Sequence, residues 1–505
     1  MCDQQQTHFT LWDIGRQRLE ITFAQGPIVS DAGRLAVRAL ERPLGILAEL
    51  AATLPDPRAP QFVRHSTERL LTQQVYQVLA GYPDCNDADT LRQDALFQIL
   101  AEVTPDGEQP LACGSTLARF QYAYTRRGQR EGEPDILLVR RVAQLERIKR
   151  LNDFLLDLFI RTRLTPPTEI ILDVDATDDP THGQQALSGY HGYYRQHQYL
   201  PLLVFDGATG FPLACWLRHG TAHASQGAVD VLRAMVQKLR AVWPRVVIQV
   251  RADSGLAVPA VYDCCEQDGL LYAIGYAANP VLERAVAQAS ADVETYYRCY
   301  GQRDPLVQRF EEVKDYQAGS WSGPRRVVAK VERTPAGSQR RFVVTNLTAK
   351  PDEVYRDFYV RRGAVPEQPI GELKNGLSAD RLSACGFCAN AWRLLVHVVA
   401  YALVVLFREA NAQVPEVARA EVSTLRQRLW KVPAVLTASA RRVVLRLSAG
   451  WPFREVFGRV LEAVVAFAGR LAGTQAGDTA VAGLPMEMDG SGPSACPGAS
   501  CRCGG

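Results

Sequence analysis

Apolar side chains in the first third of the chain recur every three or four residues, which is the period of an amphipathic helix. After an extended start, this period predicts helices over 31–54, 66–79, 88–103 and 142–161. We therefore expect residues 1–164 to form a mostly helical N-terminal domain.

From residue 165 the pattern changes to short apolar runs that are rich in β-branched residues and bounded by turns. Such runs are typical of strands, and two of them on either side of a Gly-containing turn are typical of a hairpin. The longer segments between the later runs keep a helical period. The predicted strands are 168–174, 199–205, 211–218, 246–252 and 270–275, and the predicted helices are 224–242 and 258–268.

The order of these elements is strand, hairpin of two strands, helix, strand, helix, strand. It is the order of a ribonuclease-H-like core, in which three antiparallel strands are followed by two parallel strands that helical crossovers reach. The sequence therefore predicts the α/β fold class with a mixed central sheet, and residues 165–284 form the first part of this core.

Residues 285–350 break this order. They look rich in strands, with 326–331 and 341–346 as a pair around a turn. Helical patterns return after them. We therefore expect a β-rich insertion at 285–350 and the last part of the core at 351–410.

Charge narrows the class of protein only a little. The formal net charge of the 505 residues is +3, which neither requires nor excludes a nucleic-acid partner. Residues 325–341 nevertheless carry six Arg or Lys against Glu332 alone, and 408–470 carry eleven against five Glu. Each patch is either a solvated face or a phosphate-binding track. We expect 411–472 to be a basic helical region and the Gly-rich residues 473–505 to be a disordered tail.

The longest apolar run, 391–407, contains Arg393 and His397 and is short for a membrane span. We expect it to be a core helix, with no membrane insertion. The twelve cysteines occur without an apolar leader at the N-terminus, which predicts a cytoplasmic protein with reduced thiols. The chain has no Walker loop, no G-x-S-x-G and no G-x-G-x-x-G after a strand, which argues against a metabolic α/β enzyme.

Acidic residues lie where two of the predicted strands end. Asp173 and Asp175 end the first strand, and Asp253 ends the fourth. These strands are neighbours in a ribonuclease-H-like sheet, so their carboxylates meet and repel one another unless a cation lies between them. Asp173 and Asp175 point to the same face, so spacing does not choose between them. Asp178 and Asp179 are expected to be turn residues.

Carboxylate oxygens are the ligands that Mg²⁺ or Mn²⁺ prefers. Two such ions explain how acids alone suffice for chemistry at phosphorus. One ion lowers the pKa of an attacking water or 3′-hydroxyl, and the other stabilises the leaving oxygen. No His or Ser nucleophile is then required.

Three segments resemble the DDE transposases of bacterial insertion sequences. They are LDVDATDDPTHGQQALSGYHGYY, VRADSG, and RRGAVPEQPIGELKNGL with the FCANAWRLLVHVVAYAL that comes after it. The resemblance is to the branch that has a Tyr-Arg-Glu-Lys motif and a β-rich insertion in its core. It covers about residues 5–410.

The resemblance implies that Asp175, Asp253 and Glu367 are catalytic and bind the metal ions. Asp175 closely precedes Thr177, as the first acid of the branch does, and Asp253 is followed by Ser-Gly. On this ground Asp175 fits the first position better than Asp173.

Tyr359, Arg362 and Lys374 occupy the other positions of the motif, which implies that they bind DNA. Four residues rather than three separate Arg362 from Glu367, whereas Glu367 and Lys374 keep the family spacing of seven and so share one helix face. A proline two residues after Glu367 requires Glu367 to lie at the helix start. If the helix begins later, Glu372 is the better candidate.

The implied function is that of a transposase. Such an enzyme binds the terminal inverted repeats of its element. It cleaves the DNA at each end by way of a hairpin intermediate and then joins the ends to target DNA. Because two ends are processed together, a homodimer on double-stranded DNA is expected. Residues 1–164 and 408–470 are candidates for recognising the ends. Two alternatives stay open, namely a catalytically inactive end-binding protein and a related nuclease without strand transfer.

Overall fold

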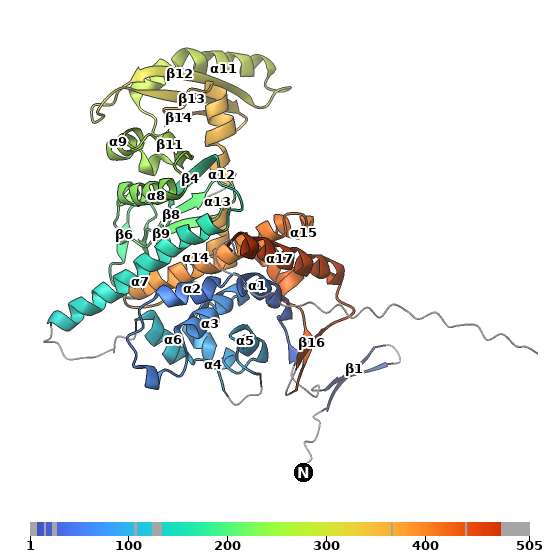
Figure 1. Ribbon diagram of the computed structural model, residues 1–505. Coiled ribbons are helices and arrows are strands. Elements are labelled where there is room, and N and C mark those ends of the chain that lie inside the picture. Colours follow the sequence, from blue (N-terminus) through green and yellow to red (C-terminus); the bar gives the residue numbers. More distant parts are fainter. Residues whose placement is uncertain are drawn as a thin grey trace, which may run out of the picture.

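The computed structural model is an elongated molecule (Figure 1). The helical N-terminal part and the inserted strands lie at opposite ends, with the first strands of the central sheet between them. The structure describes residues 8–14, 17–22, 28–105, 109–123, 134–364, 367–439 and 442–475. Side chains are described from residue 28 onward within these ranges, apart from 134–141, 363–364, 367 and 474–475.

An eight-stranded mixed sheet forms the centre of the molecule, in the order β12-β13-β14-β11-β10-β4-β8-β9. The strands β4, β10 and β11 are parallel, whereas β8 pairs antiparallel with β4 and β9 pairs antiparallel with β8. All five core strands predicted from the sequence are present, and their order confirms the predicted fold class. Their bounds are β4 Glu169–Ala176, β8 Leu202–Asp206, β9 Pro212–Trp216, β10 Val247–Ala252 and β11 Leu271–Tyr276.

Two helices connect the later strands of the core. The helix α8 (Ala228–Val242) joins β9 to β10, and α9 (Pro259–Gln267) joins β10 to β11. In α8 the buried residues recur at helical spacing, which is why this segment forms an amphipathic helix. They are Ala228, Leu232, Met235, Val236 and Leu239. Both predicted crossover helices are therefore confirmed.

The insertion extends the central sheet. An antiparallel meander of β12 (Val307–Tyr316), β13 (Arg325–Thr334) and β14 (Gly337–Thr345) joins the core where β14 pairs with β11. The predicted strand pair around residues 334–338 is thus confirmed. The three inserted strands and the five core strands therefore form one continuous sheet.

Two helices precede these strands, so the β-rich insertion predicted for 285–350 begins with a helical part that the sequence did not indicate. They are α10 (Pro280–Ala285) and α11 (Ala287–Tyr300). The side chain of Asn279 accepts hydrogen bonds from two backbone N–H groups of α10, and Pro280 stands at its first position. Both are helix-start signals.

The predicted N-terminal helices are present. A long helix, α7 (Pro134–Arg161), runs from them and contacts β9 of the central sheet. The others are α1 Leu35–Glu41, α2 Ile46–Thr53, α3 Thr67–Ala80, α4 Ala88–Leu91, α5 Ala95–Leu100 and α6 Gly114–Gln121. The extended start forms a separate two-stranded ladder of β1 (His8–Ile14) and β2 (Gln17–Thr22).

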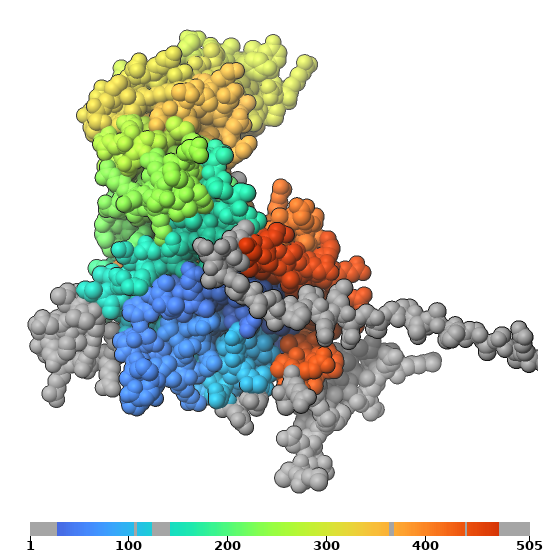
Figure 2. Space-filling view, in the orientation of Figure 1, coloured from blue at the N-terminus to red at the C-terminus, as the bar shows by residue number. Residues whose placement is uncertain are grey.

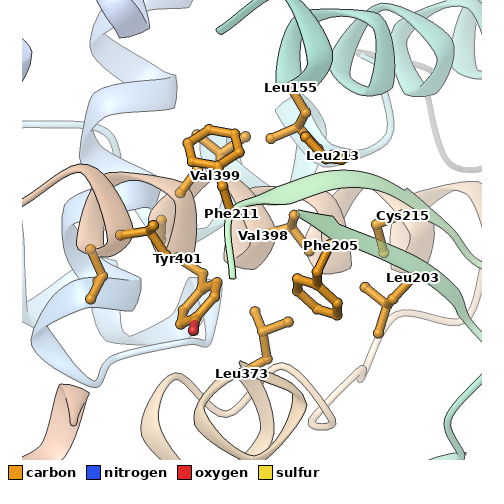
Figure 3. Packing of buried hydrophobic residues seen from close by; sticks show 14 of the residues in the cluster. Leu155, Leu203, Phe205, Phe211, Leu213, Cys215, Leu373, Val398, Val399 and Tyr401 are labelled. Atoms are coloured by element: carbon orange, nitrogen blue, oxygen red, sulfur yellow. The ribbon is translucent and has the colours of Figure 1, made fainter. Parts of the chain in front are cut away.

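The predicted core helix is α14 (Phe387–Ala410). Among the described residues it alone is long and apolar enough to cross a membrane, but its apolar window is wholly buried inside the protein, as in a core helix. Figure 3 shows Val398, Val399 and Tyr401 of α14 packed with side chains from α7, β8 and β9. This helix also contacts α1, α3, α6 and α17, so it ties the N-terminal helices to the sheet.

The chain after α14, predicted to be a basic helical region over 411–472, contains strands as well as helices. A hairpin of β15 (Ala434–Ala438) and β16 (Val443–Leu447) lies within it, and β15 also pairs with β3 (Ile28–Val29). This strand pairing joins distant parts of the chain, and five-residue strands give only a weak period-two signal. The helices here are α15 Pro415–Ala418, α16 Val422–Leu425 and α17 Arg454–Gln475, and the rest of the predicted tail, 476–505, lies outside the described residues.

Candidate active site

Asp175 and Asp253 lie at one end of two neighbouring strands. The strands β4 and β10 are parallel, with Val174 opposite Ala252, so the next position on each chain is Asp175 beside Asp253. Residues paired across strands point to the same face of a sheet. The prediction that these strand ends meet is confirmed. We call the sheet face that carries these two residues the carboxylate face.

Asp253 is held by the turn that follows β10. Its side chain caps a short 3-10 turn, Ser254–Leu256, and Oδ1 accepts the backbone N–H of Gly255 at 2.9 Å. A Cβ at position 255 would lie 2.8 Å from Ala224 Cβ and 3.0 Å from Asp253 Oδ1. The glycine after the acid therefore allows the turn that orients this carboxylate.

Asp173 serves a different purpose from Asp175. Arg251, directly opposite it on β10, donates from Nε to Oδ1 and from Nη2 to Oδ2, both at 2.6 Å. The side chains are 0% and 1% exposed. This two-bond ion pair occupies both oxygens of Asp173. Asp175, whose side chain is 12% exposed at the end of the strand, therefore stays the predicted catalytic acid of the two.

A π-helical segment, Glu353–Tyr359, packs on the carboxylate face. Its Tyr355 belongs to a small hydrophobic cluster with Ala273 of β11 and Val343 of β14. Arg251 Nη1 also donates to the backbone oxygen of Phe358 at 2.9 Å. The segment is thus fixed against the core and the insertion at once.

Tyr359, the last residue of this segment, and Arg362, in the helix that follows it, lie near the two carboxylates. Arg362, in the short helix α12 (Arg361–Ala364), places Nη2 3.0 Å from Asp175 Oδ2. The hydroxyl of Tyr359 would lie 2.5 Å from a Cβ on Gly275, on the strand next to Asp253. Burial raises the pKa of Tyr359, Arg362 opposes the rise, and the charge of Asp253 adds to it. The phenol is therefore a neutral hydrogen-bond donor close to the carboxylates.

Lys374 joins the site through a residue that we expected to be part of a turn. Its Nζ lies 2.8 Å from Asp178 Oδ1, and Asp178 Oδ2 accepts from Gln196 Nε2 at 2.8 Å. Asp178 does not lie in a turn, and both its oxygens hold side chains from distant segments. Asp179, also expected to be a turn residue, begins a short strand. The position of Asp178 three residues after Asp175 was the signal that could have found it.

Asp178 leads into a small sheet in the order β5-β7-β6. Tyr194, in the β6–β7 turn, was not singled out from the sequence. Burial and the charges of Asp178 and Asp175 raise the pKa of Tyr194 to about 12, so a second neutral phenol lies near the carboxylates. The aromatic run GYHGYY was the sequence signal that could have identified Tyr194. The strands are β5 Asp179–Pro180, β6 Gly189–His191 and β7 Gln196–Tyr199.

The last predicted acid, Glu367, is the first residue of helix α13 (Glu367–Gly371). This is the position that Pro369, two residues later, requires. The side chain of Glu367 lies outside the described residues, so its catalytic role stays a prediction. The alternative, Glu372, is buried and accepts two hydrogen bonds from Arg408, at 2.7 and 2.9 Å. A second π-helical segment, Glu372–Gly376, follows α13, so the α-helical spacing predicted between Glu367 and Lys374 does not hold.

Asp175 and Asp253 supply carboxylate oxygens on adjacent strands, the donor set that a hard divalent cation prefers. Among the described side chains no group of three or more His, Cys, Asp or Glu residues is gathered to hold a metal ion. The side chain of Glu367 is not among the described ones. The two aspartates therefore fit a divalent ion as partial ligands, and a third protein ligand stays a prediction.

A ribonuclease-H-like sheet with carboxylates at the ends of its first and fourth strands is the arrangement of the DDE class of proteins. The family model described as "Transposase DDE domain group 1" matches residues 13–468, and the chain belongs to this family. DDE transposases generally use divalent metal ions.

Among solved structures, the piggyBac transposase synaptic complex with hairpin DNA is similar over 79% of this chain and 79% of its own, at 10% identity and a TM-score of 0.39. No curated protein sequence matches the chain significantly.

Proposed function

We propose that this protein is an active transposase of a bacterial insertion sequence. On this proposal it binds the terminal inverted repeats as a homodimer in the cytoplasm, cleaves the DNA strands at each end and transfers the ends to target DNA. The observation that carries the proposal is the register of β4 and β10, which sets Asp175 beside Asp253 with Arg362 within ion-pairing distance of Asp175.

Asp175 and Asp253 would hold the divalent cations, Mg²⁺ or Mn²⁺, with Glu367 as the third acid. Two such ions supply activation of the attacking hydroxyl and stabilisation of the leaving oxygen. Asp253 is oriented for this by its hydrogen bond to Gly255.

The remaining side chains bind and orient the DNA. The neutral phenol of Tyr359 donates a hydrogen bond to a phosphate oxygen, and Arg362 and Lys374 attract the phosphate. Arg362 and Lys374 are paired with Asp175 and Asp178. Each cation thus stays in place before the substrate arrives.

The test uses the full-length protein and a duplex that carries the terminal repeat of its element, with Mg²⁺ or with EDTA. Wild type is expected to nick the duplex and to form strand-transfer product only with Mg²⁺. Asp253→Asn is expected to bind the duplex but not to cut it. Asp230→Asn, which changes an exposed acid on α8, is the matched control and is expected to behave as wild type.

Three other outcomes would contradict the proposal in different ways. Cleavage without joined product would identify a nuclease. Binding without cleavage by wild type would identify an inactive end-binding protein. Cleavage by Asp253→Asn at the wild-type rate would place the chemistry elsewhere.

A further inference from the structure

The register of the sheet carries the carboxylate face into the insertion. Gly275 of β11 is next to Asp253 in the register and is opposite Val343 of β14. Arg341 is two positions away from Val343 on the same strand, so it points to the same face. It is paired across the strands with Lys330 of β13. The row formed by Arg341 and Lys330 therefore continues the face on which the carboxylates lie.

The opposite face of the inserted strands is covered by α11. Arg340 donates from Nε to Ser290 Oγ of this helix at 3.0 Å. Arg333 lies with Nε 3.1 Å from Glu294 of the same helix. The neighbours Arg340 and Arg341 are thus on opposite faces, and Arg340 belongs to the packing of the insertion.

Two of the cations on the carboxylate face are neutralised by acids of the inserted strands. Arg326 Nε lies 3.0 Å from Glu312, and Lys330 Nζ lies 2.5 Å from Glu332. These pairs use both acids that the strands present on this face. Any further cation on this face is therefore a surplus charge.

Arg341 and Arg356 are further cations on this face. Both side chains are exposed, and in the described part of the chain each has a hydrogen bond to an amide oxygen and no ion pair with a carboxylate. Arg341 is close enough to Glu332 for their charges to interact, but Glu332 is already paired with Lys330. Arg356, from the π-helical segment, also stacks on Phe310 of β12 at 4.6 Å from the ring centroid. Phe310 is opposite Lys330, so Arg356 extends the row across the next strand.

Neighbouring strands are about 4.8 Å apart, so the row from β14 to β12 spans roughly 10 Å. In Figure 2 the segment after residue 350, in orange, lies against the inserted strands, in yellow. Exposed guanidinium groups match phosphate geometry and are weakly hydrated. A row of them beside the carboxylates suits a nucleic-acid backbone.

We propose that Arg341 and Arg356 bind the phosphate backbone of the duplex whose scissile phosphate lies at Asp175 and Asp253. This inference rests on the proposed function, because it assumes that the carboxylates act on DNA. It divides the basic stretch 325–341 between two roles. The residues on the α11 face stabilise the insertion, and those on the carboxylate face hold substrate.

The experiment measures the affinity of the full-length protein for a labelled terminal-repeat duplex, by fluorescence anisotropy in EDTA, over about 50 to 200 mM salt. Arg341→Gln combined with Arg356→Gln is expected to lower the slope of log K against log salt by about 2. It should weaken binding at the lowest salt by about tenfold or more. Arg340→Gln, the matched control, should leave both quantities unchanged. Arg341→Lys combined with Arg356→Lys keeps both positive charges and should keep most of the wild-type slope.

A wild-type slope for Arg341→Gln with Arg356→Gln would overturn the inference, provided that wild type binds the duplex and cleaves it with Mg²⁺. If wild type does not bind the duplex, both the inference and the proposed function fail. If the Gln and Lys variants lose affinity equally while the slope stays constant, the arginines support the fold and do not bind phosphate, which also overturns the inference.

Discussion

Lys374 and Asp178 form an ion pair at 2.8 Å between the last helical part of the site and the chain that follows β4. The pair is half-buried, and Gln196 holds the second oxygen of Asp178. The position of Lys374 is therefore set by residues near the first catalytic strand.

We expect Asp178→Asn to lower the cleavage rate by about tenfold to a hundredfold, because a misplaced binding group costs rate. Affinity for the duplex should change much less. Lys374→Gln should have a similar effect, and the double variant should be no worse than the more affected single variant, since the two residues act as a unit. Single-turnover cleavage rates of wild type, the two single variants and the double variant test this prediction. Additive losses would show that Asp178 does not act through Lys374.

Gly275→Ala tests the placement of Tyr359. The new methyl group would lie 2.5 Å from the phenol oxygen, so the phenol must move. We expect a loss of about 1–3 kcal/mol in the free energy of unfolding and a fall in cleavage rate. Adding Tyr359→Phe removes the clashing oxygen and should restore part of the stability but not activity, because the methyl group still lies 3.2 Å from the backbone N of Ser254.

Gly371→Ala is the control for this experiment, because among the described residues no atom outside the chain neighbours and the helix backbone lies within 4 Å of a Cβ there. It should leave stability and cleavage close to wild type. Equal stability of Gly275→Ala with and without Tyr359→Phe would contradict the proposed contact.

Substitutions of Glu367 and Glu372 should have different effects on stability and cleavage. Glu372→Gln breaks a buried ion pair with Arg408 and should cost about 3–5 kcal/mol of stability, measured by denaturant unfolding. Glu367→Gln should keep wild-type stability and lose cleavage by about a hundredfold or more. The reverse result, with Glu372→Gln stable and inactive, would move the third acid to position 372.

Asp179 should make stability depend on pH. Burial, with the charges of Asp380 and Asp178, raises the pKa of Asp179 to about 8, while in the unfolded chain it ionises near pH 4. Between these values the folded state keeps a proton that the unfolded state releases, so the free energy of unfolding falls as pH rises from about 4 to about 8. Asp179→Asn stays neutral and removes this contribution.

Urea unfolding at about pH 5 and about pH 8 checks this prediction. The variant should be more stable than wild type at the higher pH, and the gap should shrink at the lower pH. The same pH dependence in both proteins would show that Asp179 is ionised in the folded state.

The core of the fold could be predicted from the sequence because its signals are local. Each core strand is an apolar run bounded by turns, and the acids stand directly at the ends of two of them. The order of elements then made Asp175 and Asp253 neighbours. Tyr359 and Lys374 came from the spacing of a family motif.

What could not be predicted depends on pairing between distant residues. Nothing local to Asp173 shows that Arg251 will occupy it, because the partner lies 78 residues away. The same is true of Asp178 and Lys374, which are 196 residues apart. The pairing of β15 with β3, and of β14 with β11, likewise arises only when the whole chain has folded.

The burial of α14 decides how the chain can be divided. This helix is enclosed by N-terminal helices on one side and by sheet strands on the other. A fragment that begins after residue 164 would leave one flank of it bare and would aggregate. Residues 1–164 alone would likewise lack the surface against which they pack. If residues 1–164 recognise the DNA ends, this recognition and the proposed chemistry cannot be separated by truncation, and each has to be removed by point substitution within the intact chain.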